Sequence, residues 1–202
     1  MDGPSERFEA EPDDTRAAIM KATYEALLKH GYADLTIQRI GDEFAKSKSL
    51  LYHHYESKDA LLVDFMAFML EVMEEAVPVE EGETADEKLQ VVIDHVFENM
   101  LAEDDDFMHA MIELRAQAVH DEAFRESFTK NDEFITDRVR EIIADGVAEG
   151  TFRDVDPDRA ATMFLTFIQG AMFSHATTEN ADLDVIRGEL ETYLDLNLLG
   201  ED

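Results

Sequence analysis

The sequence predicts an all-α protein of nine helices, and three observations support this fold class. Apolar residues recur at helical spacing along most of the chain, no segment shows the alternation of a convincing strand, and Gly and Pro fall between the periodic segments. Capping residues mark the starts of many of these segments. The expected helices cover residues 15–30, 37–44, 48–55, 58–76, 85–100, 107–118, 122–149, 157–176 and 183–199.

The first four helices are separated by residues that favour helix ends. Asp14 is expected to cap the first helix, and Gly31 to stop it. Thr36 is placed to cap the second helix, Ser47 the third and Ser57 the fourth. The short turn between the second and third helices makes these two a compact pair.

The last five helices follow from the same rules. Residues 84–87 form a capping box at the start of the fifth helix, and four acids in a row separate it from the sixth. Asp121 is expected to cap the seventh helix, which Gly150 stops. The Asp-Pro pair at 156–157 opens the eighth helix, which is apolar around most of its circumference and precedes the ninth.

The chain is strongly acidic, with 48 Asp and Glu against 17 Lys and Arg and a net charge of −31. Such a surface repels nucleic acid and anionic membranes at low ionic strength. The carboxylates are spread over nearly every expected helix rather than gathered into acidic tails. We therefore favour adaptation to molar salt, where the Debye length falls to about 3 Å. A halophilic protein is the resulting hypothesis.

The N-terminal residues and the lengths of the apolar runs indicate where in the cell the protein is expected. Residues 1–14 are polar and acidic, so we expect a flexible arm rather than a secretory signal. No apolar run is long enough to span a bilayer, and there are no cysteines to form disulfides or thiolate metal sites. The expectation is a soluble cytoplasmic protein with no membrane partner.

The second and third helices have the spacing of a helix-turn-helix, although an ordinary αα-hairpin has the same geometry. Charge placement favours the first interpretation. Residues 15–60 hold seven basic and six acidic side chains, a net charge of +1, so the rest of the chain carries −32. Because a general pressure toward acidity has no reason to spare one region, this local neutrality indicates a polyanionic partner there.

The same region contains a set of residues at a characteristic spacing, namely Gly31, Thr36, Ile40, Ser47, Lys48, Leu51, Tyr52, His53, His54, Tyr55, Ser57, Lys58, Leu61 and Leu62. With these residues the region resembles the DNA-binding domain of TetR-type transcriptional regulators. The resemblance covers about 45 residues, and the acidic composition is similar to that of haloarchaeal members. Two positions depart from the usual pattern, with Lys46 in place of an apolar turn residue and Ser49 where glycine is frequent.

The resemblance implies a homodimeric repressor of a double-stranded DNA operator that a small hydrophobic ligand releases, with no cofactor. After the flexible arm expected from the composition of residues 1–14, it implies a helix-turn-helix domain at 15–60 and a ligand-binding and dimerisation domain at 61–202. In this reading the third helix enters the major groove, with Lys48 and Ser49 nearest the base edges. The expected DNA-binding residues are Thr36, Gln38, Lys46, Ser47, Lys48, Ser49, Tyr52, His53, His54 and Lys58.

Two further sets of residues are expected in the second domain. Met and Phe at helical spacing are typical of core packing, and they also suit an adaptable apolar cavity. The expected ligand pocket holds Phe65, Met69, Phe97, Met100, Met108, Met111, Phe128 and Phe164. Apolar surface left over on the last two helices predicts a dimer interface of Phe167, Ile168, Gly170, Ala171, Phe173, Leu190 and Leu194.

Two other classes of function are compatible with parts of the sequence. A helical enzyme or metal-binding protein would use the acids and histidines of the second half, and His109 with Glu113 has i, i+4 spacing. No His-Glu-x-x-His motif occurs, so we expect neither a catalytic site nor a metal site. An adaptor that keeps the fold only for protein contacts is the third alternative.

Overall fold

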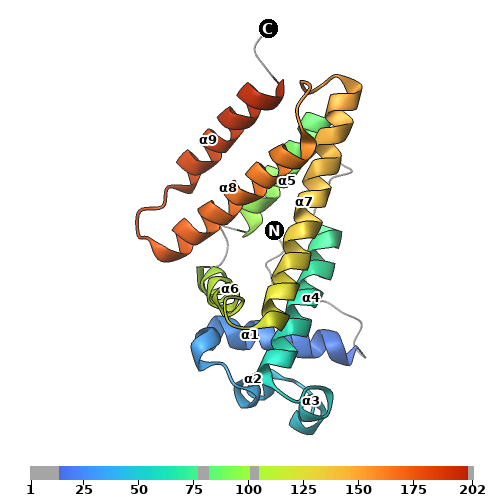
Figure 1. Cartoon of the computed structure of the whole chain (residues 1–202). Helices are drawn as coiled ribbons and strands as arrows, with labels where there is room; N and C mark the ends of the chain where they lie inside the picture. Colours follow the sequence, from blue (N-terminus) through green and yellow to red (C-terminus); the bar gives the residue numbers. More distant parts are fainter. Residues whose placement is uncertain (1–13, 77–81, 101–104, 200–202) are drawn as a thin grey trace. The chain divides into compact units, whose positions relative to one another are not determined.

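The computed structural model describes residues 14–76, 82–100 and 105–199. Within these ranges the chain forms nine α-helices and two π-helical segments and contains no strand, so the expected fold class is confirmed (Figure 1). The helices are α1 (Thr15–Asp34), α2 (Ile37–Glu43), α3 (Lys48–His54), α4 (Lys58–Ala76), α5 (Ala85–Asp94), α6 (Asp105–Gln117), α7 (Glu122–Glu149), α8 (Pro157–Thr177) and α9 (Leu183–Leu194). The expected arm lies almost entirely outside the described residues.

Side-chain caps begin five of the helices as expected. The Asp14 carboxylate accepts two backbone N–H groups of the first turn of α1, at 2.8 and 3.2 Å. The Thr36 hydroxyl accepts one in α2 at 3.1 Å, and the Ser57 hydroxyl accepts one in α4 at 3.0 Å. Asp121 and Asp156 do the same for α7 and α8. These bonds satisfy amides that have no partner within their own helix.

Three local expectations need correction or refinement. Ser47 stands at the N-cap of α3, but it makes no cap bond, and its hydroxyl lies 2.7 Å from that of Ser49. Gly31 breaks the helical backbone with φ 64°, yet the assigned bounds of α1 continue past it to Asp34. The helix expected over 85–100 changes to a π-helix at His95–Met100, and the last helix changes in the same way at Asp195–Leu199.

The chain divides into two compact units, and the first comprises residues 1–75 and 104–128. It contains α1 to α4, α6 and the first turns of α7, with α1 packed against both α2 and α6. One apolar core joins all of these helices. Its members with no more than 1% exposure include Ile19, Met20, Leu27, Ile40, Leu51, Leu61, Leu62, Phe65, Leu114 and Phe124. The proposed functional boundary at residue 60 stays a prediction, since packing alone does not test it.

The second unit comprises residues 76–103 and 129–202. Within it α8 and α9 run antiparallel, side by side (Figure 1). Gly146 of α7 lies against the Phe152 ring so closely that an added Cβ would be 2.2 Å from ring atom Cδ2. The backbone N–H of Arg153 then donates to the carbonyl of Leu198 at 2.8 Å. The segment after α7 is thereby fixed to the C-terminal π-helix.

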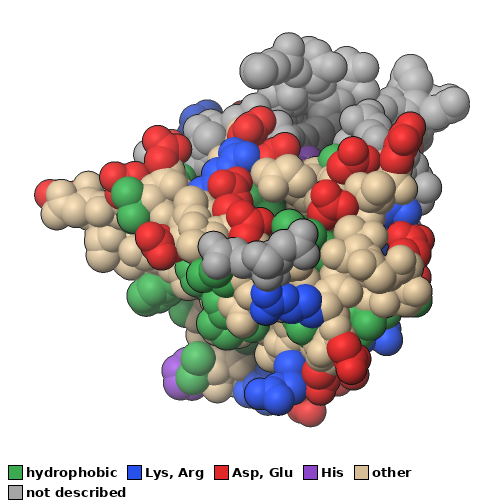
Figure 2. Space-filling view, turned by 90° about the horizontal axis from the view of Figure 1, so that it is seen from above, with side chains coloured by type: hydrophobic (Ala, Val, Ile, Leu, Met, Phe, Trp, Pro, Cys, Tyr) green, Lys and Arg blue, Asp and Glu red, His purple; other side chains and the backbone are tan. Residues whose placement is uncertain are grey.

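A single arginine ties α9 to the helices α5 and η3 (His95–Met100) in this unit. The Arg187 guanidinium donates to Glu191 at 2.8 Å, to Glu98 at 3.1 Å and also to Asp94. Acidic side chains are scattered over the face shown in Figure 2 rather than gathered in one block. None of the described helices is both long and apolar enough to cross a membrane.

Candidate nucleic-acid interface

The inward face of the α2–α3 pair is apolar. Ile40 and Leu51 have no exposed surface, and Phe44 is 6% exposed. With seven residues, α3 is too short to be stable by itself in water, so packing must hold it in place. Leu51 supplies that packing because it lies within the core of the first unit.

The opposite face of α3 is open to solvent. Ser49, Tyr52, His53 and His54 are all exposed, and Tyr52 shows 55% of its surface. The His53 and His54 rings meet edge to face with centroids 6.0 Å apart. Hydroxyl and imidazole groups in this setting can donate hydrogen bonds to phosphate oxygens or base edges. The structure therefore places these four expected DNA-binding residues on one exposed helix.

The lysines around the turn have partners within the first unit. The Lys48 ammonium donates to the carboxylate of Asp42 on α2, and both side chains are about half exposed. Lys46 extends toward α1, where its ammonium donates to the Thr15 hydroxyl at 3.4 Å. The sequence predicts Lys46 as a DNA-binding residue, and this stays a prediction. In the structure its contact with Thr15 links the turn to α1.

Lys58, at the start of α4, lies against Tyr32. Its ammonium is 4.1 Å from the centroid of the tyrosine ring, within the range of a cation–π interaction. The ring also packs edge-on against Phe124 with centroids 6.5 Å apart. The backbone N–H of Tyr32 donates to Glu113 on α6 at 2.8 Å. Lys58 is thus held at the edge of the interface by residues distant in the sequence.

Tyr55, the C-cap of α3, is fixed to α4 by a polar cluster. Its hydroxyl donates to Asp64, which also accepts hydrogen bonds from Arg16 at 2.9 and 3.2 Å. Arg16 donates in addition to Glu71 at 2.7 Å. Partial burial by itself raises the pKa of Asp64, but the hydrogen bonds from Arg16 and Tyr55 outweigh it and hold that pKa below its ordinary value. Burial and then the bond to Asp64 raise the pKa of Tyr55.

This geometry is a helix-turn-helix with its second helix exposed, and comparison with known proteins identifies its family. Residues 19–65 match the family model described as bacterial regulatory proteins of the tetR family. Residues 85–199 match that of the C-terminal part of BetI-type transcriptional repressors. The chain belongs to the TetR family of transcriptional regulators. It is therefore a DNA-binding regulator in class.

Individual relatives of this TetR-family chain agree. It is 35% identical to a TetR transcription regulator from Haloarcula marismortui, over 91% of this chain and 97% of that one, with a TM-score of 0.82. It is 25% identical to the transcriptional repressor AcnR of Corynebacterium glutamicum, over 88% and 93% of the two chains. The regulator FadR of Bacillus subtilis, solved with stearoyl-CoA, shares 22% identity over 92% of this chain and 98% of that one, with a TM-score of 0.70.

The residues expected to form the ligand pocket fall in both units. Those in the first unit are Phe65, Met69, Met108, Met111 and Phe128, and those in the second are Phe97, Met100 and Phe164. Five are buried and the side chains of Met69 and Met111 are half-buried, whereas the side chain of Met100 lies outside those described. Burial fits both core packing and a cavity lining, so this set stays a prediction.

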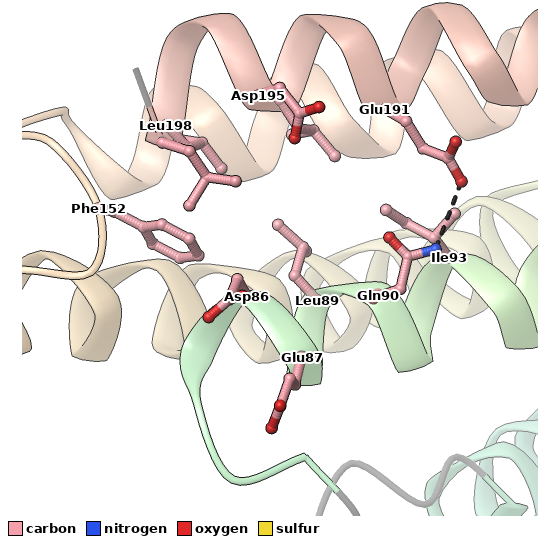
Figure 3. A pocket seen from close by; sticks show the side chains of 11 residues that line it. Asp86, Glu87, Leu89, Gln90, Ile93, Phe152, Glu191, Asp195 and Leu198 are labelled. Atoms are coloured by element: carbon pink, nitrogen blue, oxygen red, sulfur yellow. Dashed lines mark hydrogen bonds between the residues drawn. The ribbon is translucent and has the colours of Figure 1, made fainter. Parts of the chain in front are cut away.

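The second unit does contain a pocket, which the sequence did not indicate. It has a volume of about 260 Å³ and lies between α5, the segment after α7, and α9 with its π-helical end (Figure 3). Leucines, Ile93 and Phe152 supply its apolar lining, while four carboxylates and Gln90 supply the polar part. The lining residues are Asp86, Glu87, Leu89, Gln90, Ile93, Phe152, Glu191, Leu194, Asp195, Leu198 and Leu199, which include none of the eight expected residues.

Two of these carboxylates already have partners. Glu191 accepts hydrogen bonds from Arg187 at 2.8 Å and from Gln90 at 3.3 Å (Figure 3). Glu87 accepts the backbone N–H of Thr84 at 3.2 Å, which is its part of the expected capping box. Glu87 and Glu191 therefore serve the fold as well as lining this pocket.

The residues expected at the dimer interface divide into two groups. Ile168, Ala171, Leu190 and Leu194 are buried within the chain itself, Phe167 is half-buried, and Gly170 and Phe173 are exposed. Residues buried in one chain offer little surface to another. Sequence reasoning missed four exposed apolar residues of the same region, because periodicity does not say which side of a helix its own unit covers. These residues are Met163, Val185, Leu196 and Leu199.

The histidines and acids considered for a metal site do not come together. Among the residues that the structure describes, no group of three or more His, Asp or Glu side chains is placed to hold a metal ion. Glu113, the most suggestive of them, accepts the backbone N–H of Tyr32 instead. Its position is explained by a contact between α6 and the end of α1.

Proposed function

We propose that this chain is a repressor that binds operator DNA as a homodimer through α3 and is released by a small hydrophobic ligand. The observation that carries the proposal is the exposed polar face of α3, in a region (residues 15–60) where seven basic side chains outnumber six acidic ones although the whole chain is strongly acidic. Its TetR-family membership and its likeness to AcnR, a transcriptional repressor, support the direction of regulation. Such a regulator works in the cytoplasm, where the DNA is.

The DNA contacts are divided by chemistry. Lys48 and Ser49 lie at the start of α3 and read base edges in the major groove, because the N-terminal residues of a recognition helix lie deepest there. Tyr52, His53 and His54 bind phosphates from the exposed face, and Lys58 adds a charge at the start of α4. The remaining contacts come from the start of α2, with Thr36 and Gln38, and from the turn before α3, with Lys46 and Ser47. The uncharged donors matter because phosphate attraction falls steeply as salt rises.

The dimer forms through the outer faces of α8 and α9. Residues 160–178 contain no Asp, Glu, Lys or Arg in a chain of which 32% is charged. Phe173 of α8 is 59% exposed, and Val185 of α9 is 58% exposed. An uncharged helix surface with exposed apolar side chains is what an isologous interface requires. A dimer also presents two α3 helices to one operator.

The ligand shifts the population between two spacings of the paired α3 helices, only one of which fits adjacent grooves. Its apolar character is proposed from the expected Met and Phe residues. FadR of Bacillus subtilis, which has the same fold, was solved with stearoyl-CoA, and the long acyl chain of that ligand is apolar. The acidic pocket beside α9 is a poor site for an anion, because its carboxylates repel negative charge.

A gel shift with two charge-matched variants tests the proposal. The DNA is the segment upstream of the protein's own gene, in molar KCl. One variant carries Lys48→Ala and Lys58→Ala, and the other carries Lys88→Ala and Lys130→Ala in the second unit. We expect the first to lose the shifted complex and the second to retain it. Equal behaviour of the two variants, or no complex with the unaltered protein, would contradict the proposal.

A further inference from the structure

Lys48 is held from two sides by neighbouring residues of α2. Its ammonium donates to Asp42, and its side-chain stem passes over Gly41. A Cβ added to Gly41 would lie 3.3 Å from Cγ of Lys48 and 3.4 Å from its Cδ. The first separation is tighter than ordinary van der Waals contact and the second is at its lower limit, so an alanine here would displace the stem of Lys48 by a few tenths of an ångström. Gly41 lies inside a helix, where alanine is the better helix former. The close approach of Lys48 explains why a glycine occupies this position.

The pair contributes little to stability. Lys48 and Asp42 are about half exposed, and ion pairs between exposed side chains stabilise a fold very little. A free lysine side chain samples many rotamers, and part of this conformational entropy is lost when it binds. An arrangement that restricts Lys48 before binding reduces that loss. The main effect of the pair is therefore to orient the Lys48 side chain before it binds.

We propose that Asp42 is a positioning residue for sequence recognition, which directs the Lys48 ammonium to one base step. Gly41 leaves the space in which the stem of Lys48 lies. This inference rests on the proposed role of α3 in the major groove. A carboxylate beside DNA lowers the total attraction to phosphates, so Asp42 weakens binding to every sequence. By orienting Lys48 it increases the difference in affinity between the preferred sequence and others.

The adjacent residue provides a matched control. Glu43 is also an acid at the end of α2, and it accepts a hydrogen bond from Lys29 at 2.7 Å. Lys29 is on α1 and is not among the residues expected to contact DNA. Replacing either acid by its amide removes one negative charge from the same end of α2. Only the replacement of Asp42 releases Lys48.

The test measures binding of the full-length dimer to the preferred operator and to an unrelated duplex, by fluorescence anisotropy across a salt series. For Asp42→Asn we expect binding to the unrelated duplex to be as tight or tighter, and the ratio of the two affinities to fall about fivefold or more. Fivefold corresponds to the lower end of what one base contact contributes to discrimination. Gly41→Ala should lower the ratio in the same direction, and Glu43→Gln should leave it unchanged.

A double substitution separates orientation from charge. In a Lys48→Met background, Asp42→Asn should lower the ratio no further, because the residue that it positions is gone. Asp42→Asn with an unchanged ratio would overturn this inference while leaving the proposed function intact. An equal fall with Glu43→Gln would also overturn it, since charge alone would then explain the effect. Failure of the unaltered protein to prefer any duplex would overturn both.

Discussion

Two adjacent residues of α3 should separate folding from DNA binding. Leu51 is fully buried in the core of the first unit, and Tyr52 is 55% exposed on the other side of the same helix. Truncating a buried leucine to alanine costs about 2–5 kcal/mol, and a central value of about 3 kcal/mol corresponds to about 6–12 °C in Tm for a chain of this size. An exposed substitution changes stability by only about 0.5 kcal/mol.

Both variants should bind the operator more weakly, but only Leu51→Ala should do so by destabilising the fold. Tyr52→Ala should keep the Tm within about 2 °C and weaken operator binding at least tenfold, because a hydrogen bond to a charged phosphate contributes about 1.5–3 kcal/mol. Leu51→Ala should lower the Tm and weaken binding through the loss of folded α3. Thermal melting followed by circular dichroism and an anisotropy titration measure the two effects. A Tyr52→Ala protein as destabilised as Leu51→Ala, or with undiminished binding, would refute the assignment of the two faces.

Three other outcomes are expected. Asp64→Asn should lower the free energy of unfolding, measured in urea, more at pH 7 than at pH 3. A carboxyl whose pKa is lowered on folding stabilises the fold at pH values above its unfolded-state pKa and loses that effect as the pH falls through its folded-state pKa. An equal loss of stability at both pH values would contradict this. Phe173→Glu should give a monomer by light scattering, whereas Val119→Glu should not, because Val119 is even more exposed than Phe173 but lies on neither α8 nor α9. A dimeric Phe173→Glu protein would rule out the proposed interface. Gly150→Ala should lower stability by about 1–2 kcal/mol, since Gly150 has φ 79°, and a neutral effect in thermal melting would disagree.

Local chemistry explains why the helices could be predicted. Asp14, Thr36 and Ser57 act on amides two or three residues away, so the sequence contains both the cap and its partner. The same holds for the buried and exposed sides of α3, which follow from helical periodicity. The surface proposed to face DNA could be predicted from the sequence for this reason.

Contacts between distant residues could not be predicted in this way. Glu113 binds the backbone of Tyr32 across 81 positions of sequence, and nothing near either residue indicates the other. The π-helical turn that follows Asp94 has no marker such as proline or glycine. The interface set shows the same limit, because Leu190 and Leu194 are apolar in pattern but face their own unit.

Asp42 is an intermediate case. Its partner Lys48 is six residues away, and a glycine inside a short helix was a signal that something approaches closely. The signal was visible in the sequence, but the identity of the approaching residue required the structure.

Selection from a pool of randomised DNA duplexes tests the central claim most directly. The full-length protein is incubated with the pool in molar KCl, and the bound sequences are read after several rounds. A two-fold symmetric pair of α3 helices predicts enrichment of an inverted repeat with half-sites about one helical turn, or a multiple of it, apart. Bound sequences no different from the starting pool, or enrichment that persists with Tyr52→Ala and Lys48→Ala together, would contradict it.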